Sequence, residues 1–175
     1  YSLRSVEKHF EDKECPIYIF GTLKPGWLRK HKRIIWKDAW TYQSALVRGV
    51  QAAKEVLWMN DDIVLTNPTT WDDCRVPRHL KPNREDWVSN IAANGNAWRE
   101  GVLRVISDLK LHGITDIKMF STHIPYVYRR DESLQIFEKY GIWDKMPFEM
   151  AYFHEFGGES QVLDGIRVQG PDFGE

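Results

Sequence analysis

The sequence has little cysteine and no long apolar run, and both shortages narrow the class of protein. Cys15 and Cys74 are too few for a disulfide framework, and their spacing matches no zinc motif. No apolar run approaches the roughly 20 residues that a membrane-spanning helix requires, so we expect no membrane span. We expect two reduced thiols in a cytoplasmic protein.

The sequence also has no excess of charge of either sign. Its 24 Lys and Arg residues are balanced by 25 Asp and Glu residues, for a formal net charge of −1. Such a chain exerts no global attraction on nucleic acid, so a nucleic-acid partner would need a local basic patch. Hydrophobic residues make up 42% of the chain and charged residues 28%, which supports a packed core. At 175 residues we expect a single domain over 1–175 and one principal site.

Aromatic side chains are abundant instead, at 13% of the residues and with eight Trp. Most large aromatic side chains are buried in a core. Trp rings also form the walls of sugar and base pockets, where the ligand stacks on them. Either use is open for any single Trp of this chain.

The first part of the chain alternates between short apolar runs and amphipathic stretches. The run 16–21 is continuously apolar and ends in glycine, which is typical of a strand buried on both faces and favours a parallel sheet. The predicted elements are helices over 2–10 and 41–54, the latter capped by Thr41, and strands over 16–21, 33–36 and 56–59. Because an α/β domain usually opens with a strand, we expect a further short strand upstream of Tyr1.

The second part begins with a long excursion over 66–96 that shows little periodicity. Long irregular loops in compact domains are more often functional than decorative. The elements predicted after it are a helix from Trp98 that stops near Gly113, a strand over 116–121, helices over 130–140 and 147–156, and a last strand over 161–168.

An acidic turn, Asn60-Asp61-Asp62, directly follows the predicted buried strand 56–59. Two adjacent carboxylates repel one another unless a cation neutralises them. Mg²⁺ and Mn²⁺ prefer hard oxygen ligands, and they are usually held by one or two carboxylates together with the phosphates of a substrate. The turn therefore indicates a site for a metal and a diphosphate, although a solvated turn with Asn60 as turn former is the alternative.

Three segments carry a resemblance to a known family. The segments 1–10 (YSLRSVEKHF), 17–19 (IYI) and 59–63 (MNDDI) resemble, in their order, Stealth-type capsule sugar-phosphate transferases and related phage and bacterial GT-A-like proteins. The similarity covers roughly residues 1–65 well and the remainder only loosely. It implies a GT-A-like (Rossmann-like) α/β fold, a three-layer domain with a mostly parallel central sheet, whose first strand would lie upstream of residue 1.

The resemblance also implies a ligand and a division of labour at the acidic turn. In GT-A glycosyltransferases an acidic motif holds the metal and the nucleotide diphosphate, and that role carries over to Asp61 and Asp62. We expect Asp62 to bind Mn²⁺ or Mg²⁺ and Asp61 to contact the ribose or the sugar. Asn60, Trp58 and Arg48 are the further residues predicted to bind the nucleotide diphosphate sugar, most simply a UDP-sugar.

Two histidines are candidates near this site. His123 follows the predicted strand 116–121, and GT-A enzymes often add a late histidine to the metal shell. A histidine that caps a strand end before a proline is the alternative. His154 competes for the same role, although packing within a helix or lining of the acceptor side suits it better.

An inverting transferase needs a carboxylate that accepts the proton of the acceptor hydroxyl. Asp144, Glu149 and Glu155 lie in an aromatic-rich segment, and the catalytic candidates are Glu149 first and then Asp144. Pro147 should start the helix and so place Glu149 in its first turn, at the rim of a site. A helix N-terminal charge favoured by the macrodipole is the alternative, and a retaining mechanism needs no such base.

Basic residues gather in two places, and a solvated surface is their usual explanation. The two groups are Arg29, Lys30, Lys32, Arg33 and Lys37, then Arg75, Arg78, Lys81 and Arg84. DNA or a phosphorylated glycan could use such patches. The resemblance to phage proteins implies a modified DNA base as one acceptor, in the host cytoplasm if the protein is viral, and a base in a duplex would first have to be flipped out.

Three functions are consistent with the sequence. The first is a metal-dependent glycosyltransferase that moves a sugar from a nucleotide diphosphate sugar to a hydroxyl of a glycan or of DNA. The second is a Stealth-like transferase that moves a whole sugar phosphate. The third is a non-catalytic domain that binds a nucleotide sugar or DNA.

Overall fold

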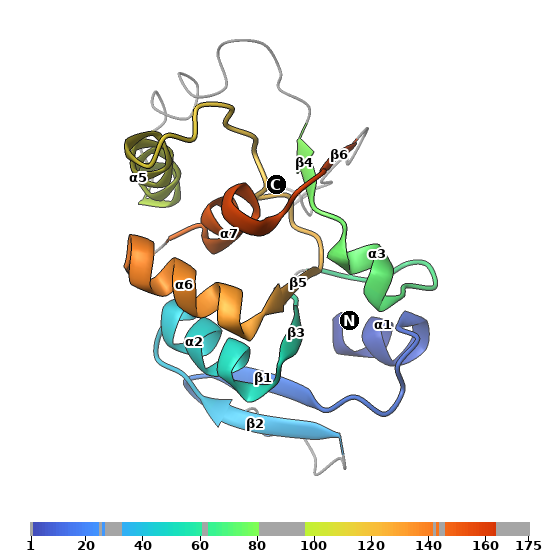
Figure 1. Ribbon diagram of the computed structural model, residues 1–175. Helices are drawn as coiled ribbons and strands as arrows, with labels where there is room; N and C mark the ends of the chain where they lie inside the picture. The colour runs from blue at the N-terminus through green and yellow to red at the C-terminus, as the bar shows by residue number, and fades with distance from the viewer. Residues whose placement is uncertain are drawn as a thin grey trace, which may run out of the picture.

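The computed structural model describes residues 2–24, 26, 33–60, 63–80, 97–141, 143 and 146–163. These residues form a mixed α/β structure with short strands (Figure 1), which confirms the predicted α/β class, but the predicted three-layer arrangement around a mostly parallel central sheet is not seen among them. Within them the strands pair as three two-stranded sheets: β1 (Ile17–Gly21) parallel to β2 (Ile34–Asp38), β3 (Glu55–Trp58) antiparallel to β5 (Tyr126–Arg129), and β4 (Arg78–Leu80) parallel to β6 (Gln161–Leu163).

The helices begin and end at residues whose local chemistry favours a helix terminus. α2 (Tyr42–Ala52) follows Thr41, whose hydroxyl accepts a hydrogen bond from the Ser44 N–H at 3.1 Å. α5 (Ala97–Leu111) is followed by Gly113, whose φ of +84° suits glycine best. The other helices are α1 (Ser2–His9), α3 (Trp71–Arg75), α6 (Arg130–Tyr140) and α7 (Phe148–Phe156). All the helices predicted from periodicity are present.

The apolar core lies where α2, α5, α6 and α7 meet β5. α7 packs against both α5 and α6, while α2 packs against β1, β3 and α6 (Figure 1). The fully buried members of the core include Val50 of α2, Val102 of α5, Ile136 of α6 and Phe148 of α7. Because α7 has neighbours on several sides, its sequence is apolar almost all round.

The strand predicted over 116–121 is wrong, because side chains of α7 take the hydrogen bonds that a neighbouring strand would have made. The Lys118 N–H donates to His154 Nε2 at 2.9 Å, and the Phe120 N–H donates to Met150 Sδ at 3.2 Å. Met119 alone forms an isolated bridge, to Leu80. The true strand, β5, follows a few residues later.

Three further expectations need adjustment. The excursion over 66–96 contains α3, with a capping box of Thr70 and Asp73, and the short strand β4; residues 81–96 lie outside the described part. β1 is only half-buried along its length rather than buried on both faces. The last strand, β6, covers 161–163 of the predicted 161–168, and the remainder lies outside the described residues.

Candidate functional site

A cavity of about 480 Å³ opens where the ends of several elements meet. β3 contributes its last residue, Trp58, and the following Asn60, while β5 contributes Tyr126 and Tyr128. α2 and α7 both begin at the cavity, since their first-turn residues line it. A cavity of this size matches small-molecule sites, which measure roughly 300–1,000 Å³.

Aromatic rings form one wall of the cavity. The Trp58 ring stacks on Phe20 with a centroid distance of 6.2 Å, and Tyr42 meets Trp58 edge to face at 5.7 Å. Gly49 of α2 makes this packing possible, because a Cβ at Gly49 would lie only 2.8 Å from Cζ3 of Trp58. Trp98 of α5 is 41% exposed and lines the cavity as well. Rings held in this way offer fixed faces on which a sugar or a base can stack.

Glu149 lies in the first turn of α7 and lines the same cavity. Burial raises the pKa of its carboxyl above the ordinary 4.5, and a hydrogen bond from Ser121 and the nearby His123 offset this only in part. Glu149 in turn adds to the effect of burial in raising the pKa values of Tyr42, Tyr126 and Tyr128. A carboxyl group whose pKa is raised towards neutrality in a cavity is suited to proton transfer.

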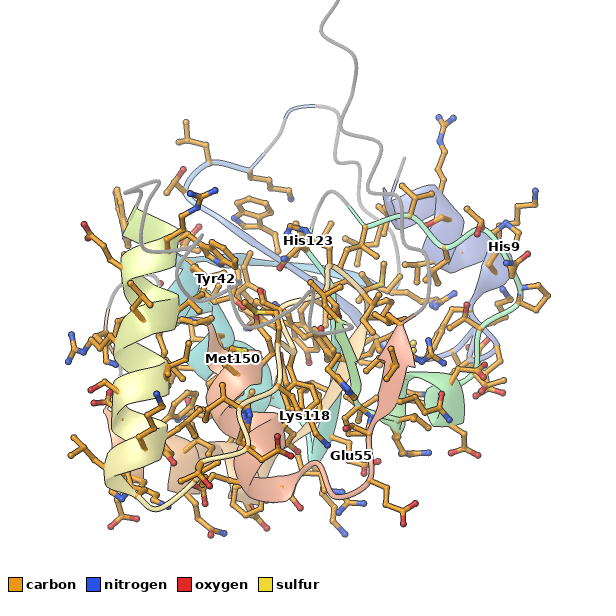
Figure 2. The ribbon with its side chains drawn as sticks, turned by 90° about the horizontal axis from the view of Figure 1, so that it is seen from above. His9, Tyr42, Glu55, Lys118, His123 and Met150 are labelled. Carbon is orange, nitrogen blue, oxygen red and sulfur yellow. The ribbon has the colours of Figure 1, made fainter. Side chains whose placement is uncertain are left out.

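His123 is exposed, lines the cavity and has an unusual backbone conformation, with φ at +48°. Residues other than glycine seldom adopt this left-handed conformation, and such outliers cluster at functional sites. In Figure 2 the labels of His123 and Tyr42 lie near each other, apart from those of His9 and Glu55. The exposed imidazole therefore lies at the surface of the cavity.

The described residues on either side of the acidic turn both line this cavity. Asp61 and Asp62 lie outside the described residues, and the neighbours on either side are Asn60 and Ile63. The Ile63 N–H donates to the Asn60 carbonyl at 3.2 Å.

The described side chains at the cavity include groups of a type that binds metal ions, but they do not by themselves form a complete metal site. Within the described ranges, no three His, Cys, Asp or Glu side chains gather closely enough to hold a metal ion. The amide oxygen of Asn60 and the imidazole of His123 line one cavity and are ligand types that Mn²⁺ accepts. The metal site predicted at Asp62 stays a prediction.

Other predicted residues lie elsewhere. Arg48 donates a hydrogen bond to the backbone carbonyl of Asp38 on an exposed face and does not line the cavity. Asp144 lies outside the described residues. Glu155 forms an ion pair with Lys139 at 2.6 Å, accepts a hydrogen bond from the Tyr140 hydroxyl and does not line the cavity.

His154 has a packing role. Its Nε2 accepts the Lys118 N–H, and its Nδ1 lies 2.6 Å from the Met150 carbonyl, so the tautomer protonated at Nδ1 satisfies both contacts. Burial lowers its pKa. Both ring nitrogens are thus used within the fold, and neither is available to a metal.

The described members of the basic groups are partly engaged in the fold. Arg33 donates to the Cys15 carbonyl at 3.2 Å. Arg75 forms ion pairs with Glu55 at 2.9 Å and with Asp72. Arg29, Lys30, Lys32, Lys81 and Arg84 lie outside the described residues.

Several cavity residues were not predicted from the sequence. These are Tyr42, Gln43, Trp98, Ser121, Tyr126 and Tyr128. Tyr42 and Gln43 could have been found as first-turn residues of a capped helix that follows a strand, since ligands often bind at such helix starts. The tyrosines of β5 carry no comparable signal, because a buried aromatic strand is most simply read as core.

Within the part of the chain that the structure covers, no helix has the length and apolar character to cross a membrane. No protein-family model matches the chain, and no curated protein matches it.

Proposed function

We propose that the chain is a metal-dependent glycosyltransferase domain of the GT-A type, which moves a sugar from a UDP-sugar to an acceptor hydroxyl. One observation carries the proposal: the two residues that flank the acidic turn line the same cavity as an aromatic wall, His123 and Glu149. The cavity thus combines, in one place, groups that suit each part of a nucleotide sugar.

The acidic turn is proposed to bind the metal and the diphosphate. Asp62 would be the direct ligand of Mn²⁺ or Mg²⁺, Asp61 would contact the ribose or the sugar, and His123 would join the metal shell. When bound, the metal would supply stabilisation of the negative charge that develops on the leaving diphosphate. The starts of α2 and α7 support the same charge, since the N-terminal end of a helix carries partial positive charge.

Glu149 is proposed as the base that accepts the proton of the acceptor hydroxyl. Its position in the cavity and its raised pKa support this role. Ser121 hydrogen-bonds to the carboxyl and so orients it. Asp144 is the alternative base. Trp58 and Tyr42 would hold the sugar or the base of the nucleotide by stacking.

The mass of the product distinguishes the related reactions. An added hexose or pentose supports the sugar transfer proposed here, whereas an added sugar phosphate would indicate a Stealth-like reaction. Hydroxyls of a glycan and of a modified DNA base are both compatible acceptors, and offering each in turn identifies the substrate.

The binding step is tested by thermal shift with a panel of nucleotide sugars, each with and without Mn²⁺. A ligand that binds only the native state stabilises it and so raises Tm. At a free ligand concentration about a hundred times Kd, the gain in the free energy of unfolding is about 2.7 kcal/mol. We expect UDP-sugars to raise Tm only when Mn²⁺ is present, and Asp62→Ala to abolish the shift without lowering the Tm of the free protein.

Asp131→Ala is the matched control, because Asp131 is an exposed carboxylate on α6 that pairs with Arg130. It should retain the full shift. A shift that persists in Asp62→Ala, or one that does not require the metal, would reject the site.

A further inference from the structure

Three polar atoms in the cavity wall have no hydrogen-bond partner among the described residues. They are Nε2 of Gln43, Nε1 of Trp58 and the hydroxyl of Tyr128. Trp58 Nε1 belongs to the aromatic wall, and the other two atoms are polar groups that can turn to bind a ligand. Gln43 is 8% exposed and Tyr128 is fully buried, and both side chains line the cavity. Unpartnered polar atoms at this depth are uncommon, because each one gives up its hydrogen bonds to water without replacement.

Other polar groups of the same wall are satisfied, which sets these three atoms apart. The Tyr126 hydroxyl donates to the Phe120 carbonyl and accepts the Thr122 N–H. Ser121 hydrogen-bonds to Glu149. The protein thus has the means to pair buried polar groups in this region, and it leaves Trp58 Nε1, Gln43 Nε2 and the Tyr128 hydroxyl unpaired.

The side chains of Gln43 and Tyr128 are held by different elements. Gln43 lies in the first turn of α2, behind the capping residue Thr41. Tyr128 lies on β5 opposite Val56 of β3, the strand that leads to the acidic turn. Their meeting at one cavity therefore depends on the tertiary fold and not on any local motif.

We propose that Gln43 and Tyr128 are specificity-determining residues that bind a hydroxyl group of the transferred sugar, an inference that rests on the proposed function. An amide N–H only donates, while a phenol hydroxyl donates or accepts, so together they suit a group that both accepts and donates. A sugar hydroxyl does both. A phosphate oxygen only accepts.

The surroundings fit a sugar as well. Tyr42 and Trp58 offer aromatic faces for the apolar side of a sugar ring, next to the polar corner formed by Gln43 and Tyr128. The outer torsion of a glutamine side chain is broad, so the Gln43 amide can turn towards a ligand at little cost. A site built to bond a hydroxyl rejects analogues that lack it, because its buried groups are then left unpaired.

The test compares UDP with UDP-glucose and UDP-galactose in the presence of Mn²⁺, by titration calorimetry. The ratio of the Kd of UDP to the Kd of the better UDP-sugar isolates the contribution of the sugar. We expect Gln43→Leu and Tyr128→Phe each to lower this ratio about tenfold while the Kd of UDP changes less than twofold. Gln51→Leu is the control, because Gln51 is an exposed residue of the same helix that does not line the cavity, and it should keep the ratio.

A second readout separates recognition from a structural role. Removing an unpartnered buried hydroxyl should leave the Tm of free Tyr128→Phe unchanged or raised, whereas a structural hydroxyl would lower it. A retained Kd ratio in both variants, or an equal loss of affinity for UDP and UDP-sugar, would overturn the inference while leaving the proposed function standing. Failure of wild type to bind UDP and both UDP-sugars would overturn both.

Discussion

Glu149 is a carboxyl group that faces a cavity walled by tyrosines, with its pKa raised chiefly by burial. A raised pKa in the folded state means that the native protein binds the proton more tightly than the unfolded chain does. The stability that this provides is fully present below the ordinary pKa of 4.5 and is lost as pH rises through the folded pKa. Above that range, burial of the carboxyl group is therefore a stability cost.

Glu149→Gln should remove that cost. We expect the variant to have a higher Tm than wild type at about pH 7 and the same Tm at about pH 4, with the difference growing as pH rises above 4.5. Thermal unfolding followed by circular dichroism across this range measures it.

Glu155→Gln is the matched control, because it is a glutamate of the same helix with the opposite shift. Burial opposes ionisation of Glu155, but Lys139 and Tyr140 hold its pKa below the ordinary 4.5. The ionised Glu155 carboxylate therefore stabilises the protein at pH values above 4.5. The control should therefore lower Tm at neutral pH. A Glu149→Gln variant that is less stable than wild type at neutral pH would show that the carboxylate is needed by the fold.

At the scale of elements, the contact between α2 and β3 fixes the aromatic wall. The Trp58 ring lies between Phe20 and the bare backbone of Gly49. A methyl group at Gly49 would force the Trp58 ring to move, at a cost of about 1–3 kcal/mol for an overpacked core. It would also gain about 1 kcal/mol, because alanine is the better helix former.

The sign of the Gly49→Ala effect should thus depend on Trp58. We expect Gly49→Ala to lower the free energy of unfolding by up to about 2 kcal/mol in wild type, and to raise it by up to about 1 kcal/mol when Trp58→Phe has removed the contacting atoms. Urea unfolding of the two single variants and the double variant forms the cycle. An equal effect of Gly49→Ala in both backgrounds would mean that the Trp58 ring is not held by this contact.

The elements that sequence patterns predict correctly are those with local signals. Thr41 and Gly113 bound helices that periodicity already indicates, and both boundaries are confirmed. The pattern failed at 116–121, because the extended segment there is bound by His154 and Met150 of α7, which no local pattern reveals. β5 was missed because the strand is short, has few aromatic residues and continues directly into α6.

The candidate site was foreseen only in part, for a similar reason. Asn60, Trp58, His123 and Glu149 were predicted separately, from a turn, a resemblance and a helix start, and the structure brings them to one cavity. Gln43 and Tyr128 could not be found, since an unpartnered buried atom exists only once the chain has folded. Arg48, in contrast, lies away from the cavity on the exposed side of α2.

At the scale of the whole molecule, the cavity collects residues that are distant along the chain. Tyr42, Trp58, His123 and Glu149 come from α2, β3, the segment before β5, and α7. The core that holds these elements together lies directly beside the cavity, since Tyr126, Tyr128, Met146 and Phe148 belong to the core and most of them also line the cavity. Folding of the core and formation of the site are therefore one event.

The central claim, a metal-dependent sugar transfer in this cavity, is tested most directly by the rate at which UDP is released from a UDP-sugar, with water as the acceptor. The account predicts release that requires Mn²⁺, is lost in Asp62→Ala, falls about 10²–10⁴-fold in Glu149→Gln, and is unchanged in Asp131→Ala. Release that continues without a divalent metal, or at the wild-type rate in Asp62→Ala, would contradict it.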